Sequence, residues 1–503
     1  MTGLSAAPLF WLPTLFVGLP VLLFAMAGAE RPTRAAAFRS GFMVGFAFAW
    51  GYFAVTLNWL GAAFVQEGGE YLLLMPLAIG ALAALLALFW GLGTGLAALV
   101  PATGWRRMLL LVALIGAAEW ARGHLFTGFP FNLLGYALTG TPEMMQLDGV
   151  IGPYGLTLLA LLLGFSPAAL VRGKILPLGL AVLALGAQFG FGTWHLQSTP
   201  TTFTETRVRL VQPMILEHAS WNTSDPAAIL GQLTALSAPG LAGTDLLVWP
   251  ESVFPFFLGR YPAGISQIGT MLPEGTTLLT GAPREPLNPD GTVIPDNPGY
   301  NSVLALTRGG EMVGSYDKVH LVPFGEYLPF QNFWRSLGIS QFVPGTNGWA
   351  PGTNSRLLTL PGLPPFLALI CYEAIFPGDI GPVADARFIV NVTNDAWFDG
   401  SMGPGQHAHH AQMRAVETGL PLLRAANSGL TYATDGLGRI VASLPAGEAG
   451  KLDLDLPDPV PPPLYARLGD WPFVLALLGF AGIALPSRGR KRNARRVPPL
   501  SGT

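Results

Sequence analysis

One cysteine is the residue of this sequence best suited to covalent chemistry. Cys371 is the only cysteine among 503 residues, and it lies in the apolar run 366–373, which is typical of a buried strand that ends on a polar tip. A lone cysteine in such a run is more often a small hydrophobic residue than a nucleophile. A nucleophilic thiol needs a base, and its acyl adduct needs a partner for the oxyanion. The rest of the chain must therefore supply both.

Two other segments supply a carboxylate and a cation. Glu251 comes directly after the strand-like run 245–249 and Pro250, a residue that cannot continue the hydrogen bonding of a strand. Lys318 lies among apolar and aromatic side chains in 315–327 and not on a polar face. A solvated loop acid and a lysine that extends to solvent are the plainer alternatives. Together with Cys371, these residues would provide a base, a cation and a nucleophile.

Four motifs around these residues resemble the carbon-nitrogen hydrolase (nitrilase) superfamily and, within it, the apolipoprotein N-acyltransferases of the bacterial inner membrane. The motifs are Trp249-Pro-Glu-Ser252, Asp317-Lys-Val-His-Leu-Val-Pro-Phe-Gly-Glu-Tyr327, Ile370-Cys-Tyr-Glu373, and Asn394-Asp-Ala-Trp-Phe398 with Gly403-Pro404 and Gln406-His407. Their order matches that of the family, and the resemblance covers nearly the whole chain. It implies an α-β-β-α sandwich for the domain that carries the motifs.

The resemblance also implies a two-step acyl transfer of the ping-pong type. Glu251 would take the proton of Cys371, whose thiolate attacks the ester of a membrane phospholipid. Lys318 would stabilise the oxyanion, together with a backbone N–H near Tyr372. The α-amine of a diacylglyceryl-cysteine at the N-terminus of an apolipoprotein would then attack the thioester. No cofactor is expected, because the ester supplies the acyl group.

A supporting layer and the absence of a metal complete the expected site. The resemblance implies that Glu326 orients Lys318 or holds its charge, with Tyr372 and Glu373 as further supporting residues, Glu373 being the weaker carboxylate. A cluster of histidines lies at His407, His409 and His410. Adjacent residues of a helix do not face one site, so we expect a solvated or packed helix start there, and no metal centre.

Aromatic residues gather near the motifs. The candidates are Phe324, Tyr327, Phe330, Phe333, Trp334 and Trp397. Such clusters fill protein cores about as often as they bind ligands. In an enzyme at a bilayer they would let acyl chains enter without crossing water, so we expect a lipid gate among them.

Composition independently indicates a membrane protein. Charged residues make up 12%, hydrophobic residues 50%, and the mean hydropathy is +0.44, against about 25% charged residues in soluble domains. Because a crossing takes about 20 residues, we predict six spans within 1–196 and a seventh later in the chain. The predicted spans lie near 8–28, 38–57, 71–99, 107–126, 151–170, 175–194 and 465–486.

Basic loops predict the orientation, because Arg and Lys are retained on the cytoplasmic side. The loops after the first, third and fifth spans carry Arg31, Arg34, Arg39, Arg106, Arg107, Arg172 and Lys174. The domain after residue 195 is therefore expected in the periplasm. The basic tail 487–503 is expected in the cytoplasm, as a membrane anchor in preference to a nucleic-acid-binding segment.

The span count differs from the family pattern of eight spans with both ends cytoplasmic. Seven spans start the chain outside, so one N-terminal span would be missing. Either the recorded start codon is internal or this member has lost a helix. The run 8–28 lacks the charged start of a signal peptide, and we do not interpret it as one.

Residues 200–456 are expected to form a second domain. Strand-like runs at 207–211, 246–249, 277–280, 302–306, 367–371 and 388–392 alternate with helical stretches such as 226–236 and 407–418. This pattern favours an α/β layered domain. The expected fold class is a polytopic α-helical membrane domain plus an α/β nitrilase-like α-β-β-α sandwich, joined by the Pro-rich linker 457–464 to the last span.

Two features of the membrane part have alternative interpretations. The Gly-rich run 91–95 lacks the strand and lysine of a phosphate loop, so helix packing explains it better. Glu119 and Arg122 lie one helical turn apart near a span end. They would pair for stability or help to bind a lipid head group.

Three classes of function are compatible with the sequence. A membrane-tethered amidase or nitrilase-type hydrolase would pass the acyl group to water. A transporter or receptor with an inactive external domain would leave Glu251, Lys318 and Cys371 without a role. An acyltransferase accounts for the spans and for the site, and is the function we expect.

Overall fold

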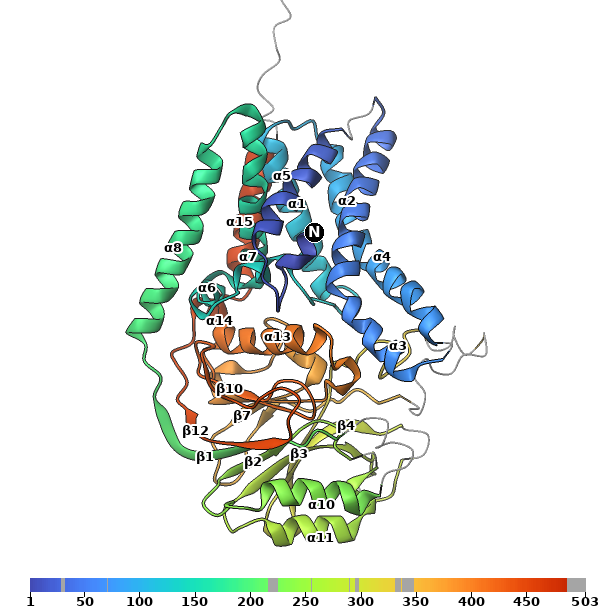
Figure 1. Ribbon diagram of the computed structural model, residues 1–503, viewed down its shortest axis with the longest axis vertical. Coiled ribbons are helices and arrows are strands. Elements are labelled where there is room, and N and C mark those ends of the chain that lie inside the picture. Colours follow the sequence, from blue (N-terminus) through green and yellow to red (C-terminus); the bar gives the residue numbers. More distant parts are fainter. Residues whose placement is uncertain are drawn as a thin grey trace, which may run out of the picture.

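The computed structural model describes residues 1–28, 32–69, 71–215, 225–254, 256–288, 290–294, 298–330, 336 and 348–485. Within these residues a group of helices stands on a domain built from two sheets (Figure 1). This arrangement confirms the expected fold class, a helical membrane domain joined to a nitrilase-like sandwich.

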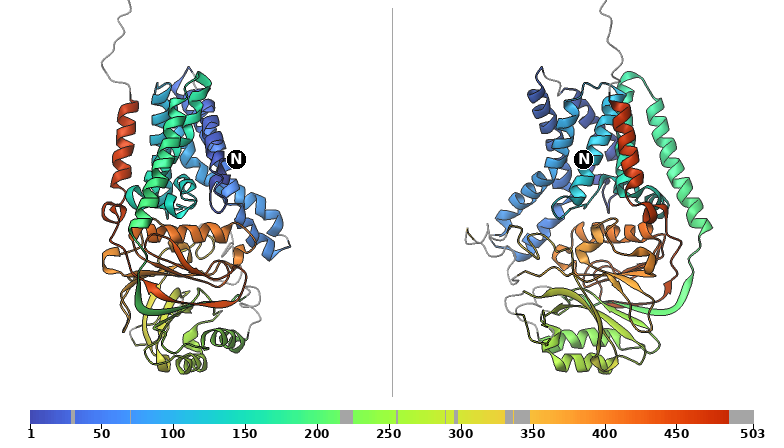
Figure 2. Two further views of the ribbon diagram at one scale, coloured as in Figure 1. Left: turned by 60° about the vertical axis from the view of Figure 1, so that its left-hand side comes forward. Right: turned by 180° about the vertical axis from the view of Figure 1, so that it is seen from behind.

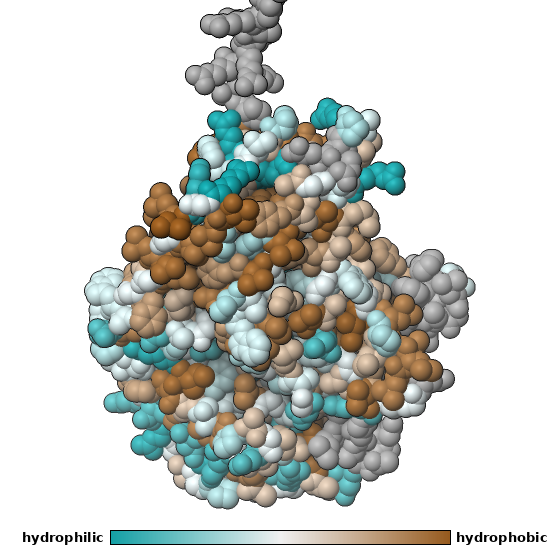
Figure 3. Space-filling view, turned by 45° about the horizontal axis from the view of Figure 1, so that its top comes forward, coloured by the Kyte–Doolittle hydropathy of each residue, from teal (hydrophilic) through white to brown (hydrophobic). Residues whose placement is uncertain are grey.

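The helical part is formed mainly by the first 198 residues. Its helices are α1 (Pro13–Ala27), α2 (Arg34–Thr56), α3 (Gly61–Glu67), α4 (Tyr71–Ala98), α5 (Trp105–His124), α6 (Pro142–Met145), α7 (Asp148–Phe165) and α8 (Leu176–Ser198), joined by α14 (Leu464–Leu468) and α15 (Trp471–Ala484) from the far end of the chain. Hydrophobic side chains gather over this part, with polar residues at its outer end (Figure 3).

Each predicted span coincides with a helix, but not all of these helices are long and apolar enough to cross a membrane alone. Within the described residues three qualify: α4, α7 with its extension to Arg172, and α8. A fourth is counted if α2 and the segment 58–66, which meet at a bend of 49°, form one span. Helices α1 and α15 are apolar but shorter. The number of seven spans stays a prediction.

Helices α2 and α4 approach each other closely because glycines form their contact. A Cβ atom added to Gly91 would lie 2.9 Å from the ring of Phe42, and one added to Gly95 would lie 2.9 Å from that of Phe38. Small residues at a helix crossing let the two backbones pack at short distance. The Gly-rich run 91–95 is therefore a packing motif.

The second domain contains two six-stranded sheets. The first has the order β12-β1-β2-β3-β4-β5 and the second β11-β10-β9-β8-β7-β6. Their bounds are β1 (Phe203–Gln212), β2 (Leu246–Trp249), β3 (Thr277–Arg284), β4 (Tyr300–Leu306), β5 (Met312–Asp317), β6 (Leu357–Leu358), β7 (Phe366–Ile370), β8 (Phe388–Thr393), β9 (Leu422–Ala426), β10 (Tyr432–Thr434), β11 (Ile440–Ser443) and β12 (Gly450–Pro457). Apolar side chains of both sheets share one buried core, as in other sheet-on-sheet packings.

Helices cover the outer face of each sheet. Helices α10 (Pro226–Ser237) and α11 (Pro262–Met271) lie on the first sheet, away from the membrane helices, and α13 (Gly403–Thr418) lies between the second sheet and the helical part (Figures 1 and 2). In the centre of the sheets β1, β2 and β3 run parallel, as do β7, β8 and β9. The residues that follow β2, β7 and β8 therefore emerge at the carboxyl edges of these parallel strands.

Helix α13 joins the sandwich to the helical part through buried polar contacts. His409 Nε2 lies 2.8 Å from the hydroxyl of Thr139, and the backbone N–H of Asn132 donates to His410 Nε2 over 3.2 Å. Gln406 accepts from the side chain of Asn132 over 2.9 Å. Burial and then Arg414 lower the pKa of His409 to about 3. The histidine cluster is thus a packed junction and not a solvated helix start.

Arg122 and Glu119 form a buried pair in the helical part. Arg122 donates through Nε and Nη2 to the two carboxylate oxygens of Glu119, over 2.8 and 2.7 Å, and neither side chain is exposed. Its Nη1 also donates to the carbonyls of Phe129 and Phe131. The pair therefore holds the loop 125–133 in place, and the alternative role in head-group binding is not supported because the guanidinium is fully buried.

Candidate active site

Cys371 stands on a sharp turn between a strand and a helical turn. The strand β7 ends at Ile370, and Cys371 begins the 3-10 turn η7 (Cys371–Ile375) with φ at +49°. This corrects the prediction that the strand includes the cysteine. A left-handed conformation is strained for a residue with a side chain, and such strain is typical of functional sites.

Lys318 lies between two carboxylates at the end of β5. Its Nζ is 3.3 Å from Glu251 Oε1 and 2.8 Å from Glu326 Oε1, and its side chain is only 1% exposed. The amide of Asn301 donates to both of these oxygens, over 2.8 and 3.0 Å. The second oxygen of Glu251 accepts from the backbone N–H of Asn394 over 3.0 Å. The structure thus brings together the cation and both carboxylates that the sequence analysis selected.

Charge and burial set the protonation states of this cluster. Burial by itself lowers the pKa of Lys318, but Glu251 and Glu326 outweigh it and raise that pKa well above its usual value, so the lysine is a cation. Burial, and after it the charge of Glu251, raise the pKa of the Cys371 thiol, which Lys318 only partly offsets. The site therefore holds a neutral thiol together with a fixed cation and its carboxylate partners.

Glu373 connects the Lys318 segment to the turn of Cys371. Its fully buried carboxylate accepts from the backbone N–H groups of Val319 and His320, over 3.0 and 3.2 Å, and from that of Ile370 over 2.8 Å. The hydroxyl of Tyr316 donates to it over 2.6 Å. Its position fits the supporting role expected for it, through the backbone on each side of the site and not through Nζ of the lysine.

Comparison with known proteins shows the family of this chain. Residues 1–166 match the model of the apolipoprotein N-acyltransferase N-terminal domain, and residues 207–458 match that of carbon-nitrogen hydrolases. The apolipoprotein N-acyltransferase of Rhodopseudomonas palustris is 42% identical over 494 residues, which cover 94% of this chain and 90% of that protein. This chain belongs to the apolipoprotein N-acyltransferase family. The family member of Brucella melitensis is 40% identical over 95% of this chain and 92% of its own length.

Solved structures give a more distant likeness. An amidase from Nesterenkonia sp. shares 21% identity over 51% of this chain and 92% of that chain, with a TM-score of 0.37. This similarity is too distant to bear on the site. Membership in the acyltransferase family, together with the apolar helices, makes the chain a multi-pass membrane protein.

Tyr372 connects the turn at Cys371 of this acyltransferase to the helical part. Its hydroxyl donates to the carbonyl of Gly128 over 3.3 Å, in the loop that Arg122 holds. Its ring contacts those of Phe129 and Phe376. The turn that carries Cys371 is therefore packed directly against the membrane domain.

The gate candidates differ in their exposure. Phe324 and Phe330 are exposed by 45% and 81%. Tyr327 and Trp397 are half-buried. The remaining candidates, Phe333 and Trp334, lie outside the described residues. The gate stays a prediction.

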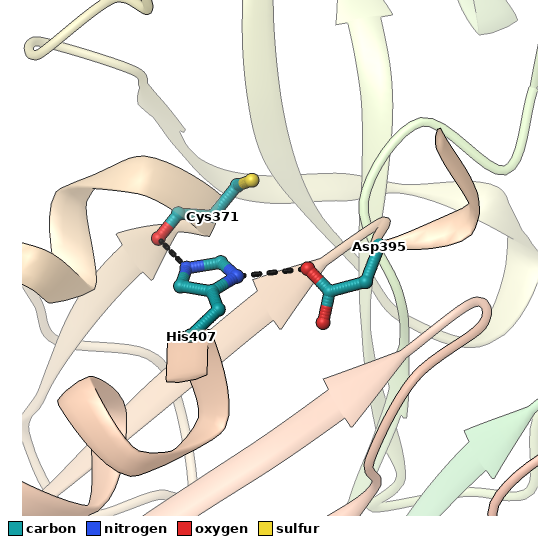
Figure 4. Close-up of side chains that lie close together, drawn as sticks. All are labelled: Cys371, Asp395 and His407. Carbon is teal, nitrogen blue, oxygen red and sulfur yellow. Dashed lines mark hydrogen bonds and ion pairs between the residues drawn. The ribbon is translucent and has the colours of Figure 1, made fainter. Parts of the chain in front are cut away.

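A second polar network, to which the sequence analysis assigned no role, lies behind the cysteine. His407, from α13, binds Asp395 through Nδ1 over 2.8 Å and faces the carbonyl oxygen of Cys371 through Nε2 over 3.0 Å (Figure 4). Arg424 donates to the other oxygen of Asp395 over 2.7 Å. The motif Asn394–Phe398 and the pair Gln406-His407 contain two of these residues, but only the fold shows that they meet.

The same cluster offers donor atoms that a metal could use. Ligand atoms of Cys371, Asp395 and His407 lie within 4.8 Å of one another. Both imidazole nitrogens are already engaged by oxygens, and the positive charge of Arg424 is next to the carboxylate. We therefore interpret the cluster as a hydrogen-bonded network.

The raised pKa of Cys371 predicts its reactivity toward iodoacetamide. Only the thiolate reacts, so at pH 7 to 8 the native protein should be alkylated more slowly than free cysteine, whose pKa is about 8.5. The rate should still rise above about pH 9, where that of free cysteine levels off. Mass spectrometry measures it without ambiguity, because the chain has one cysteine. A plateau near pH 7 would contradict the prediction.

Glu373→Gln is expected to destabilise the protein. Whichever way the amide is turned, an N–H₂ group faces at least one backbone donor, and the buried contact with Arg356 loses its charge. We expect a loss of about 3 kcal/mol in the free energy of unfolding, measured by denaturant titration in detergent. Glu274→Gln, at a 92% exposed side chain, is the matched control and should change nothing measurable. Equal stability of both variants would refute this role.

Proposed function

We propose that this protein transfers a fatty acyl chain from a membrane phospholipid, through a thioester on Cys371, to the N-terminal amine of diacylglyceryl-cysteine in apolipoproteins. The observation that carries the proposal is the buried Lys318 between Glu251 and Glu326, which acts on the thiol of Cys371 at the membrane side of the sandwich. Membership in the apolipoprotein N-acyltransferase family supports it.

In the first half-reaction the phospholipid is the acyl donor. Glu251 accepts the proton of the thiol as Sγ of Cys371 attacks the ester carbonyl. Lys318 and the N–H of Tyr372 stabilise the oxyanion of the tetrahedral intermediate. The C–O bond of the ester then breaks, and the lysophospholipid leaves with the proton from Glu251. Glu326 keeps the ammonium group of Lys318 in position.

In the second half-reaction the lipoprotein amine is the acceptor. The amine attacks the thioester carbonyl, and the same cation stabilises the second oxyanion. Glu251 accepts a proton from the attacking nitrogen, the C–S bond breaks, and the proton passes to the thiolate of Cys371. The products are an amide and the free enzyme, so the cycle consumes no nucleotide.

The donor and acceptor are both lipids, so the site must be reached from the bilayer. We infer an inner-membrane protein whose sandwich lies in the periplasm, as the basic loops predict. The exposed rings of Phe324 and Phe330 are the candidates for the entry of acyl chains. The packing of Tyr372 against the loop at Gly128 supports a site that opens toward the membrane helices.

A membrane-tethered hydrolase would use the same residues and is the alternative. The experiment that separates the two is intact mass spectrometry of the native protein in detergent with phospholipid, followed by addition of a diacylated lipopeptide. We expect one acyl mass on the protein, sensitive to neutral hydroxylamine, and its transfer to the lipopeptide. Loss of the acyl group to water alone would identify a hydrolase, and absence of an adduct would reject both.

A further inference from the structure

The carbonyl oxygen of the nucleophile residue has a side-chain partner. Nε2 of His407 lies 3.0 Å from the oxygen of Cys371, and the hydrogen bond of the ring runs to this oxygen and not to the sulfur, which lies within 4.8 Å of a ring nitrogen (Figure 4). His407 is largely buried, with 10% of its side chain exposed. The ring therefore acts on the backbone of the nucleophile and not on its thiol.

Two acceptors surround the imidazole ring. Nδ1 is 2.8 Å from Asp395 Oδ1, and Nε2 faces a carbonyl, so the ring serves both contacts as a donor only when it carries both protons. Arg424 lies 3.3 Å from Nδ1, but its shorter contact, of 2.7 Å, is with the other oxygen of Asp395. Burial raises the pKa of Asp395, yet His407 and Arg424 outweigh it and lower that pKa. Asp395, which lies between the side chains of Arg424 and His407, thus fixes the orientation of the imidazole ring.

We propose that His407 is a positioning residue for acyl transfer, which holds and polarises the peptide group between Cys371 and Tyr372. This inference rests on the proposed function. The peptide is planar, so a carbonyl that points to His407 directs the N–H of Tyr372 to the opposite side. A donor on the carbonyl also strengthens that N–H as a donor, because hydrogen bonds through one amide reinforce each other. His407, on the opposite side of the peptide group, would thereby orient the N–H of Tyr372 toward the oxyanion.

The same network relates the nucleophile to its base. Asn394 donates its backbone N–H to Glu251, and its neighbour Asp395 holds His407. The two residues after β8 therefore fix both Glu251 and, through the imidazole, the turn of Cys371. The left-handed conformation of Cys371 needs such an external restraint, because its φ of +49° is unfavourable in isolation.

Two substitutions separate the contacts of the ring. In His407→Gln the amide nitrogen reaches the position of Nε2 and keeps a donor for the Cys371 carbonyl, but the contact with Asp395 is lost. In His407→Asn the nitrogen reaches only the position of Nδ1, so the carbonyl loses its donor. His409→Asn is the matched control, since His409 is buried on the same helix and binds Thr139.

The test measures the single-turnover rate of thioester formation with phospholipid, the iodoacetamide rate of Cys371, and thermal unfolding. We expect His407→Asn to lower the acylation rate by about 10²-fold, the effect of a misplacement of about 1 Å. His407→Gln should retain most of the native rate, and His409→Asn should acylate as the native protein does. The iodoacetamide rate needs no phospholipid and shows that the thiol is present and accessible.

Each outcome decides the proposal. Native rates in His407→Asn, or equal losses in His407→Asn and His409→Asn, would overturn it. If His407→Asn does not fold, His407→Gln decides the proposal alone. A loss of about 10²-fold in its acylation rate, or its failure to fold, would show that the ring stabilises the fold through Asp395 and does not position the peptide group. If the native protein itself forms no thioester while its thiol reacts with iodoacetamide, the proposed function fails, and not this contact alone.

Discussion

Cys371→Ala is expected to abolish acyl transfer, with no acyl mass on the protein and no acylated lipopeptide. Loss of the nucleophile removes the covalent intermediate, and in comparable enzymes that costs on the order of 10⁶-fold in turnover. Electrophoretic mobility or mass of the lipopeptide measures the product. Because the chain has one cysteine, no other thiol can replace it.

Cys371→Ser is the matched control for this result. The serine side chain is close to that of cysteine in size and should preserve the turn at residue 371, but its hydroxyl is a much poorer nucleophile. Transfer should therefore also be lost, while the thermal unfolding temperature stays close to native. Residual transfer by Cys371→Ala at a tenth of the native rate or more would show that the acyl group passes directly between the substrates, and the thioester route would be rejected.

Glu251→Gln is expected to have the second largest effect, a loss of about 10²- to 10⁴-fold in the rate of thioester formation. The amide keeps the shape of the side chain but cannot take the proton of Cys371. Because the charge of Glu251 helps to raise the pKa of the thiol, its removal lowers that pKa, and iodoacetamide should react faster with this variant than with the native protein at pH 8. Slow acylation with fast alkylation is the signature of a missing base.

Glu326→Gln provides the comparison within the same cluster. Both carboxylates contact Nζ of Lys318 and the amide of Asn301, so both substitutions disturb the same hydrogen bonds. Only Glu251 also receives the N–H of Asn394, on the side toward the network of Asp395. We expect the smaller loss of activity in Glu326→Gln. The reverse order would exchange the roles of base and supporting carboxylate.

The proximity of the site to the helical part distinguishes this enzyme from a soluble hydrolase with an added anchor. Tyr372 contacts the loop at Gly128 through its hydroxyl, and its ring packs against that of Phe129. The turn that carries Cys371 is therefore braced by the membrane domain. The helices do more than anchor the sandwich, because they form part of the support of its active site.

The sequence by itself identified the residues of the candidate site. Glu251 follows a strand-like run and Cys371 lies at the end of one, whereas Lys318 is a charge among apolar residues, and the motifs around all three carry the resemblance to the family. The predicted strands at 246–249 and 388–392 agree with β2 and β8, because continuous apolar runs with clear ends determine buried central strands. Long apolar runs likewise predicted the helices.

The strands β5, β6, β9, β10, β11 and β12 were not predicted. β6, β10 and β11 have between two and four residues, too few for a periodic pattern, and they form only because a neighbouring strand offers hydrogen-bond partners. The end of β7 before Cys371 was missed for a similar reason. A left-handed turn at a cysteine has no local signal, and contacts such as that of Ile370 with Glu373 stabilise it.

Tertiary structure alone decided what surrounds the site. Asn301, Asn394 and His407 are polar residues of ordinary type, and nothing in their local sequence says that they meet Glu251 and Cys371. Their contacts join residues 36 to 143 positions apart. Asn301 lies on β4, Asn394 follows β8 of the other sheet and His407 lies on α13, so they become neighbours only when the two sheets and this helix pack together. Local pattern therefore specifies the groups that can react, whereas the long-range pairing of the sheets specifies the groups that hold them.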